Sequence, residues 1–229
     1  MFQYQHITSL CLILLMGFSL SDGSAAQKSN SPDIALPKPD IKYGIPLNSA
    51  LQSRRSHRKF SEKPLSLTNL SQLLWSAQGV THLFGFRTAP SAGALYPLEI
   101  YVVVSNVDRL QPGVYHYKPG SHRLVQIIEG NHQKQLSNAA LQQRSIANAA
   151  ATFVITGVIR RTEKKYGQRA IQYVHIETGN VSQNVYLQAT SLNLGTVFIG
   201  AFNEEKVKHI MQLPQDHEPL GLMPISHRP

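Results

Sequence analysis

A run of basic residues at positions 54–60 is the first part of the chain whose residue types could do chemistry. Five of its seven residues can carry a positive charge, namely Arg54, Arg55, His57, Arg58 and Lys59. Arginine side chains bind phosphate oxygens through paired N–H groups, and Ser56 would add a hydroxyl donor. The run therefore predicts a phosphate clamp, with a solvated basic face or a sorting signal as the plainer alternative.

Two segments of small residues could bring the backbone close to a flat ligand. The first lies between two prolines at residues 90–97 and reads PSAGALYP, and the second, at residues 195–202, reads GTVFIGAF. Small side chains and proline make a narrow, rigid segment, and such a turn can aim backbone N–H groups at a ligand. An ordinary tight loop and an ordinary strand-to-helix junction are the alternatives.

The elements that must position these segments follow from hydrophobic periodicity, capping residues and β-branched runs. We expect helices over residues 47–53, 67–78, 131–148, 166–192 and 204–211, with Ser66 and Asn203 as N-caps and Gly79 as a stop. We expect strands over residues 98–104, 151–159, 196–199 and 221–225, and a hairpin of 114–117 with 124–128. Helices and strands alternate without a strict βαβ rhythm, which predicts a single α+β domain.

Composition narrows the class of protein. A chain of 229 residues, 42% hydrophobic, can bury a core without disulfides, and its single cysteine, Cys11, excludes a cysteine-based metal site. None of the ten histidines has a metal-ligand spacing, and we expect His116 and His122 at the surface. The net charge of +9 favours anionic partners. The basic residues are dispersed, however, which argues against nucleic-acid binding. The sequence also contains no basic amphipathic helix that would favour binding to a membrane surface.

The N-terminal residues predict export. Residues 7–20 form an apolar run that is shorter than the about 20 residues needed to span a bilayer. Ser24 and Ala26 have the small size found at signal cleavage sites. We therefore expect a signal peptide over residues 1–26, with an uncleaved membrane anchor as the alternative, then an extended leader over 27–46 and the functional domain over 47–229. The expected location is periplasmic or secreted, which argues against a nucleic-acid partner.

In this order, the segments resemble the nitroreductase family of FMN flavoproteins, and in particular its branch of azoline-oxidising, SagB-type dehydrogenases. The resemblance covers about residues 51–229. The basic run is similar to the family's phosphate-binding motif, and PSAGALYP is similar to its loop beside the isoalloxazine ring. The resemblance implies a nitroreductase-like fold with a central, mostly antiparallel sheet flanked by helices. It also implies an intertwined homodimer with flavin sites between the subunits.

The resemblance further implies roles for individual residues. The FMN phosphate and ribityl chain would be held by Arg54, Arg55, Ser56 and Arg58, with a second phosphate contact from Arg228. The ring would be flanked by Pro90, Ser91, Ala92, Gly93 and Ala94, and the backbone N–H groups of Gly200 and Ala201 would meet it near N5. Lys165 and Tyr166 coincide with a pair that azoline dehydrogenases use for proton abstraction. The alternative for residues 160–165 is a charged loop that precedes a helix.

These roles predict an exported FMN-dependent oxidoreductase of the SagB-type dehydrogenase branch, with hydride transfer through flavin N5. The alternatives are an NAD(P)H-dependent nitro or quinone reductase and a non-catalytic flavin-fold binding protein. A small molecule or a peptide is the expected substrate, with NAD(P)H or another electron donor as a further partner. No metal is expected.

Overall fold

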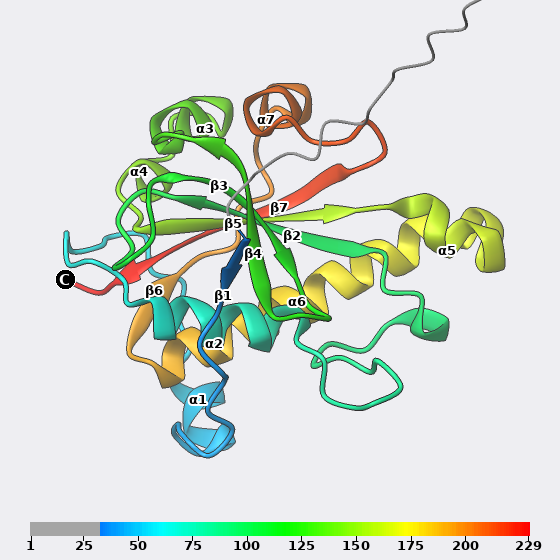
Figure 1. Ribbon diagram of the computed structural model, residues 1–229, viewed down its shortest axis with the longest axis horizontal. Coiled ribbons are helices and arrows are strands. Elements are labelled where there is room, and N and C mark those ends of the chain that lie inside the picture. Colours follow the sequence, from blue (N-terminus) through cyan, green and yellow to red (C-terminus); the bar gives the residue numbers. More distant parts are fainter. Residues whose placement is uncertain (1–32) are drawn as a thin grey trace, which may run out of the picture. The chain divides into compact units, whose positions relative to one another are not determined.

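The computed structural model describes residues 33–229, so the predicted signal peptide lies outside the described residues. The described residues form a seven-stranded sheet with the strand order β1-β4-β3-β2-β5-β7-β6 (Figure 1). Every neighbouring pair in this order is antiparallel. The strands are β1 (Asp33–Ala35), β2 (Leu98–Val104), β3 (Gly113–Lys118), β4 (Arg123–Glu129), β5 (Ala151–Gly157), β6 (Leu194–Thr196) and β7 (Glu218–His227).

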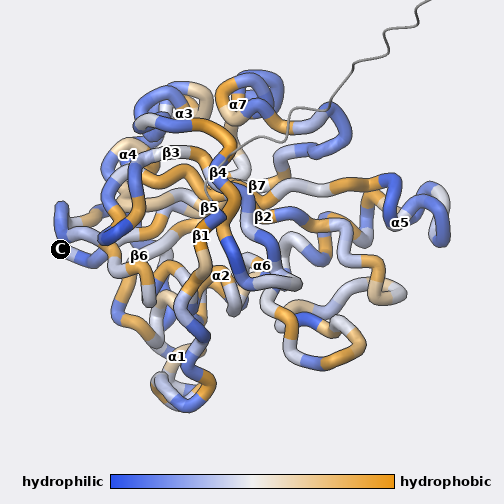
Figure 2. Tube along the Cα trace, in the orientation of Figure 1, coloured by the Kyte–Doolittle hydropathy of each residue, from blue (hydrophilic) through white to orange (hydrophobic). Residues whose placement is uncertain are grey.

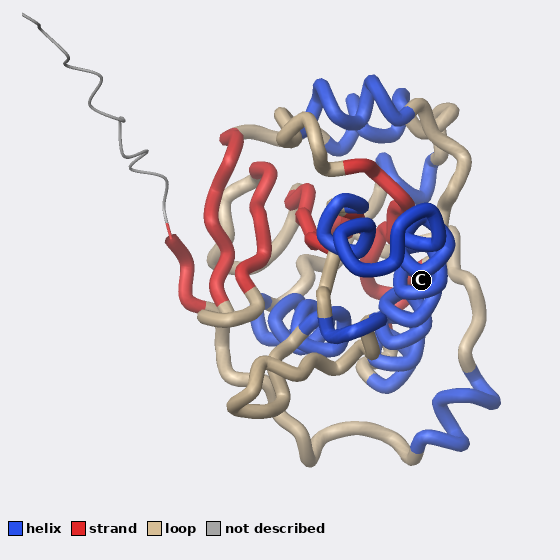
Figure 3. Tube along the Cα trace, turned by 90° about the vertical axis from the view of Figure 1, so that its right-hand side faces the viewer, coloured by secondary structure: helices blue, strands red, loops and turns tan. Residues whose placement is uncertain are grey.

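Helices cover both faces of this sheet (Figures 1 and 3). One face packs against α2 (Leu67–Gln78) and α6 (Ala170–Ser191), and α1 (Leu47–Ser53) contacts α6. The other face packs against α3 (Gln133–Ala139), α4 (Arg144–Ala147) and α7 (Glu204–Met211). The α+β class and the antiparallel sheet flanked by helices are confirmed.

Alternate side chains of β2 pack into the two apolar clusters on opposite faces of the sheet. Its residues Ile100 and Val102 belong to the apolar cluster under α2 and α6, whereas Tyr101 and Val103 belong to the cluster under the opposite helices. Successive side chains of a strand point to opposite faces, so a central strand buried on both faces must be apolar throughout. Figure 2 shows the matching orange, hydrophobic stretch at the centre of the sheet.

Between residues 47 and 129, the structure contains the predicted elements. Helix α2 begins after Ser66, whose side chain accepts a hydrogen bond from the backbone N–H of Asn69 at 3.1 Å, and it ends at Gly79. The expected hairpin is formed by β3 and β4. The segment predicted as an extended leader contains a strand that was not predicted, β1, which pairs with β4 at the edge of the sheet.

Several boundaries differ from the sequence prediction, and the strand expected over 151–159 ends at Gly157. The helix expected over 131–148 is two short helices, α3 and α4, because Leu141 and Gln142 between them have left-handed φ values of 54° and 59°. The strand expected over 196–199 lies earlier, at β6, where it pairs with the chain end. The last strand, β7, spans ten residues because it pairs with β5 and β6 on its two sides.

The segment after β5 is also different from the charged-loop alternative. Residues 159–166 form helix α5 (Ile159–Tyr166), and a 3-10 turn (Gly167–Arg169) then leads into α6. The long helix therefore begins at Ala170 rather than at Tyr166. Within residues 33–229, no helix combines the length and the apolar character needed to cross a membrane.

Candidate functional site

The basic run lies beside the edge strand β6. The backbone N–H of His57 donates to the carbonyl of Thr196 at 2.9 Å. The chain end, which follows β7, lies against the same strand. Nε of Arg228 donates a hydrogen bond to the carbonyl of Leu194 in β6 at 3.0 Å. The pairing of β6 with β7 thus brings Arg228 to the run at residues 54–58, although about 170 positions separate them in the sequence.

Two nitrogen atoms at this place are buried and lack a hydrogen-bond partner among the described residues. They are Nε2 of His57 and Nη2 of Arg228. Burial, together with the neighbouring positive charge of Arg228, lowers the pKa of His57, so the imidazole is neutral at pH 7. Buried polar nitrogens without a partner are rare in folded proteins. A bound anion such as a phosphate would satisfy both of them.

Tyr186 of α6 connects the basic run with the second segment of small residues. Its hydroxyl accepts a hydrogen bond from the backbone N–H of Phe198 at 2.7 Å and lies 3.1 Å from the hydroxyl of Ser56. Its ring also lies 5.1 Å from the guanidinium carbon of Arg54, a cation–π contact. One aromatic side chain therefore holds Arg54, Ser56 and the segment between β6 and Gly200 in a common arrangement.

The other predicted ligands at this end of the site are exposed. The guanidinium of Arg55 donates to the backbone carbonyls of Gln52 and Arg54, at 3.0 and 2.7 Å, and so caps the end of α1. Arg58 is exposed, and so are Gly200 and Ala201 after β6. Because Gly200 and Ala201 are exposed, their backbone is accessible to the edge of a ligand.

The PSAGALYP loop has an unusual backbone that α6 supports. Gly93, Ala94 and Tyr96 have φ values of +61°, +54° and +47°, a region that costs free energy for residues other than glycine. The carboxylate of Glu177 accepts a hydrogen bond from the backbone N–H of Ala92 at 2.9 Å. The hydroxyl of Ser91 accepts one from the N–H of Tyr96 at 2.9 Å. These two bonds fix the loop from inside.

The sequence prediction assigned no role in the site to Glu177, His57 or Tyr186, and Glu177 is the one that a sequence signal could have revealed. It is only 4% exposed, and burial raises its pKa, with hydrogen bonds from the backbone of Ala92 and from Ser91 acting in the opposite direction. Two turns further along the same face of α6, Asn184 donates to the carbonyl of Thr88 at 3.2 Å. A charged residue inside an otherwise apolar helix face was the available signal, and His57 and Tyr186 gave no comparable one.

The predicted pair Lys165 and Tyr166 lies against the loop. A Cβ atom added to Gly93 would be 2.9 Å from Nζ of Lys165 and 2.9 Å from the hydroxyl of Tyr166. The ammonium of Lys165 lies 5.5 Å from the centre of the Tyr166 ring. Only a glycine leaves room for both ends, so the fold places an amine and a phenol directly beside the backbone of the loop.

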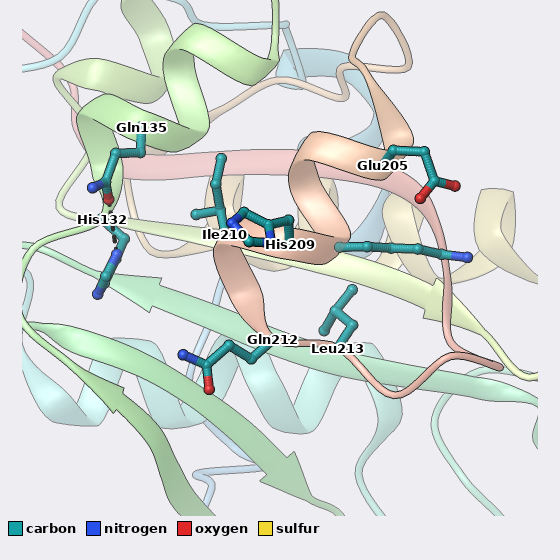
Figure 4. Close-up of a pocket in the computed structure, with 8 residues that line it drawn as sticks. His132, Gln135, Glu205, His209, Ile210, Gln212 and Leu213 are labelled. Carbon is teal, nitrogen blue, oxygen red and sulfur yellow. Dashed lines mark hydrogen bonds between the residues drawn. The ribbon is translucent and has the colours of Figure 1, made fainter.

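A surface groove lies between α3 and α7, away from the residues described above (Figure 4). It has a volume of about 600 Å³ and is lined by residues that include His132, Gln135 and His209. Both ring nitrogens of His132 are already bonded, to the Gln135 side chain and to the carbonyl of Glu129. None of the predicted site residues lines this groove. The described residues also contain no group of three or more potential metal ligands.

Comparison with known proteins gives relatives along most of the chain. Residues 51–227 match the nitroreductase family. The nitroreductase MJ1384 of Methanocaldococcus jannaschii is 46% identical over 190 residues, which cover 83% of this chain and 94% of that protein. The microcin B17-processing protein McbC of Escherichia coli is 29% identical over 136 residues, covering 56% of this chain and 49% of McbC.

Solved structures agree with these relatives. A nitroreductase structure from Ralstonia eutropha superposes with a TM-score of 0.76 at 29% identity, covering 86% of this chain and 90% of that one. A chain of the Escherichia coli microcin synthetase McbBCD complex superposes with a TM-score of 0.66 at 23% identity, covering 95% and 85%, which supports the fold alone. The resemblance found in the motifs is therefore confirmed: the chain belongs to the nitroreductase family of oxidoreductases.

Proposed function

We propose that the protein is an FMN-dependent dehydrogenase of the SagB type. The observation that carries this proposal is the position of Lys165 and Tyr166, whose ends lie against Gly93 in the loop that would flank the flavin ring. An oxidoreductase that only passes hydride to a quinone or nitro group needs no base for a carbon-bound proton. A dehydrogenase does need one, and an amine beside a phenol supplies it.

The described residues fit FMN at both ends. The buried, unpartnered nitrogens of His57 and Arg228, together with Arg54 and Ser56, offer donors and positive charge to a phosphate. The exposed backbone at Gly200 offers donors to the edge of a ring. The loop held by Glu177 is the segment that would flank the ring. Bound FMN would supply a hydride acceptor at N5.

Each residue of the pair would have a separate part in the reaction. Oxidation of an azoline removes two protons and two electrons in total. One proton would leave with both electrons as a hydride, and a base of the protein must take the other proton. Nζ of Lys165, in its neutral form, would take that proton and become an ammonium. The hydroxyl of Tyr166 lies beside the same point of the loop and would orient the substrate or the amine.

Named relatives support this choice of reaction. The chain is 28% identical over 193 residues to the trifolitoxin operon protein TfxC and shares 29% identity with McbC, a microcin-processing protein. The chain spans about half the length of each. The 46% identity to a nitroreductase favours the second candidate, an NAD(P)H-dependent nitro or quinone reductase.

We also propose that the protein acts as a homodimer. Several predicted flavin ligands are exposed in the single chain, including Gly93, Ala94 and Gly200. Large apolar side chains are also exposed on α1 and α6, with Leu47 and Ile171 at 64% and 54%. Association of two chains would bury apolar side chains of this kind. Sedimentation of a monomer that still binds FMN stoichiometrically would contradict this proposal.

The test of the reaction compares variants that share one helix. Lys165→Ala and Tyr166→Phe should lower oxidation of a synthetic azoline peptide by about 10²–10⁴-fold, while FMN absorbance and reduction of an artificial quinone stay at wild-type levels. Lys164→Ala is the matched control, because it removes an exposed lysine from the same turn of α5. If the Lys165 and Tyr166 variants keep wild-type azoline oxidation, the reductase is the better proposal.

Export remains a proposal from the N-terminal sequence alone. An apolar run followed by Ser24 and Ala26 supports cleavage after Ala26. N-terminal sequencing of protein recovered from outside the cytoplasm should begin at Gln27. Soluble cytoplasmic protein with residues 1–26 intact would contradict it.

A further inference from the structure

A second polar cavity lies on the opposite face of the sheet from α6, where no predicted flavin ligand lines it. It has a volume of about 390 Å³, and it is bounded by the start of β2, by β3, by α5 and by the segment that follows α7. Tyr101 and His116, which stand opposite each other in the register of β2 and β3, form its floor with their rings stacked at 4.3 Å. Ligand sites typically have about 300–1,000 Å³, so the volume suits a metabolite-sized molecule.

The one acid of this cavity is fully used within the protein. The two carboxylate oxygens of Glu99 are bonded separately, one by Nε2 of His116 at 2.7 Å and the other by the guanidinium of Arg161. The ammonium of Lys118 lies 2.8 Å from Nδ1 of His116. Because an ammonium only donates, Nδ1 must accept, and Nε2 of His116 carries the hydrogen given to Glu99.

The tautomer of His217 follows from Tyr101 in the same way. The Tyr101 hydroxyl lies 3.0 Å from Nδ1 of His217. Burial, followed by the charge of Glu99, raises the pKa of Tyr101, so the phenol keeps its hydrogen and donates it. Burial is also the largest influence that lowers the pKa of His217, which is therefore neutral. With Nδ1 accepting, its Nε2 carries the remaining hydrogen and lies in a residue that lines the cavity.

The cavity consequently has hydrogen-bond donors without a partner in the described residues, and its one carboxylate is already bonded. Lys118 retains two N–H groups, His217 retains one, and the side-chain amide of Gln212 adds two more. Lys118 and Arg161 contribute two positive charges against one negative charge of Glu99, and the neighbouring Arg160 is paired with Asp216 at 2.9 Å. Ile127 and Pro214 form an apolar wall.

We propose that this cavity binds a small organic anion through its carboxylate or phosphate group. The oxyanion would accept hydrogen bonds from Lys118 and from Nε2 of His217, while its carbon skeleton contacts Ile127 and Pro214. The net charge of the lining is thereby neutralised. The site is separate from the flavin residues, so it stands whether or not the proposed dehydrogenase activity is correct.

The experiment is a titration of the full chain, saturated with FMN, with citrate and with inorganic phosphate. Sodium chloride of equal ionic strength is the reference. Imidazole ring signals in NMR spectra report binding locally, and the His217→Gln variant assigns the signal of His217. We expect one or both anions to shift that signal saturably and to raise the melting temperature. Citrate alone indicates a carboxylate ligand, and phosphate alone indicates a phosphorylated one.

Variants separate this site from general charge effects. Lys118→Gln should weaken binding about tenfold or more, as expected for one charge-assisted hydrogen bond. Lys134→Gln makes the same charge change at an exposed position of α3 and should bind as wild type does. If Lys118→Gln does not fold, Gln212→Gly serves instead, because Gln212 already has a φ of +48° that glycine adopts freely. Failure of both anions to move the His217 signal, or equal binding by the Lys118 variant, overturns the proposal.

Discussion

Gly93→Ala tests the central geometric claim, because the added methyl group has two separable effects. The backbone φ of +61° disfavours alanine by roughly 1–2 kcal/mol. The methyl carbon would also lie 2.9 Å from the ends of Lys165 and Tyr166. Both neighbours are the far ends of flexible side chains, so they can move away at little cost in stability. The variant should therefore lose modest stability but lose the arrangement of the pair.

Gly85→Ala is the matched control for the backbone effect. Gly85 also has a positive φ, +80°, but an added Cβ would meet nothing within 4 Å. Both variants should unfold with melting temperatures lower by about 2–8 °C, since 1 kcal/mol corresponds to about 2–4 °C in a domain of this size. Only Gly93→Ala should also lose azoline oxidation, measured with the same synthetic peptide at saturating FMN.

Two results would refute this reasoning. If Gly93→Ala is destabilised far more than Gly85→Ala, the ends of Lys165 and Tyr166 are rigidly held, and their displacement is not free. If both variants oxidise the azoline peptide at the same rate, the contact with Gly93 does not determine the position of the catalytic pair. Circular dichroism of both variants should match wild type, which separates these outcomes from global unfolding.

Three further predictions concern other parts of the fold. Ser66→Ala removes the acceptor for the N–H of Asn69 and should lower the free energy of unfolding by about 0.5–2 kcal/mol in urea titrations; an unchanged midpoint would show that the cap contributes nothing. Tyr186→Phe leaves the N–H of Phe198 without its acceptor and should cost about 1–3 kcal/mol by the same measurement, with weaker FMN binding; wild-type values for both would exclude Tyr186 as the connecting residue. Burial alone would raise the pKa of Glu99, but hydrogen bonds from His116 and Arg161 lower it to about 2. A lowered pKa stabilises the folded state fully above the ordinary value of 4.5 and progressively less as the pH falls toward 2. Glu99→Gln should therefore be less stable than wild type at pH 7, and the gap should narrow between pH 4.5 and 2; a gap independent of pH would contradict this assignment.

Local interactions explain which elements could be predicted from the sequence. The cap at Ser66, the stop at Gly79 and the β-branched run of β2 act within a few residues, so their positions follow from the order of residue types. The helix expected over 131–148 failed for the complementary reason. Its pattern is helical, but the left-handed backbone at Leu141 breaks the chain into two short helices that both pack against the same face of the sheet.

The surface location expected for His116 was wrong, because the neighbour that buries it is distant in the chain. His116 is 8% exposed, since it stacks on Tyr101 and bonds Glu99 across a strand pair. A histidine in a predicted hairpin gives no sign of which face it occupies until the register with the next strand is known. The same register creates the second polar cavity.

Motifs such as PSAGALYP lie within a short segment, so the order of residues was enough to identify the family, the α+β class and the residue types of the candidate site. The antiparallel sheet followed from the family resemblance. Which of the site residues meet depends on how distant elements pack. The pairing of β6 with β7 brings Arg228 to His57, and the turn between α5 and α6 brings Lys165 to Gly93. The tertiary structure also decided that a buried carboxylate, Glu177, holds the loop. Contacts of this kind depend on distances between elements far apart in the chain, and no local pattern of residues encodes those distances.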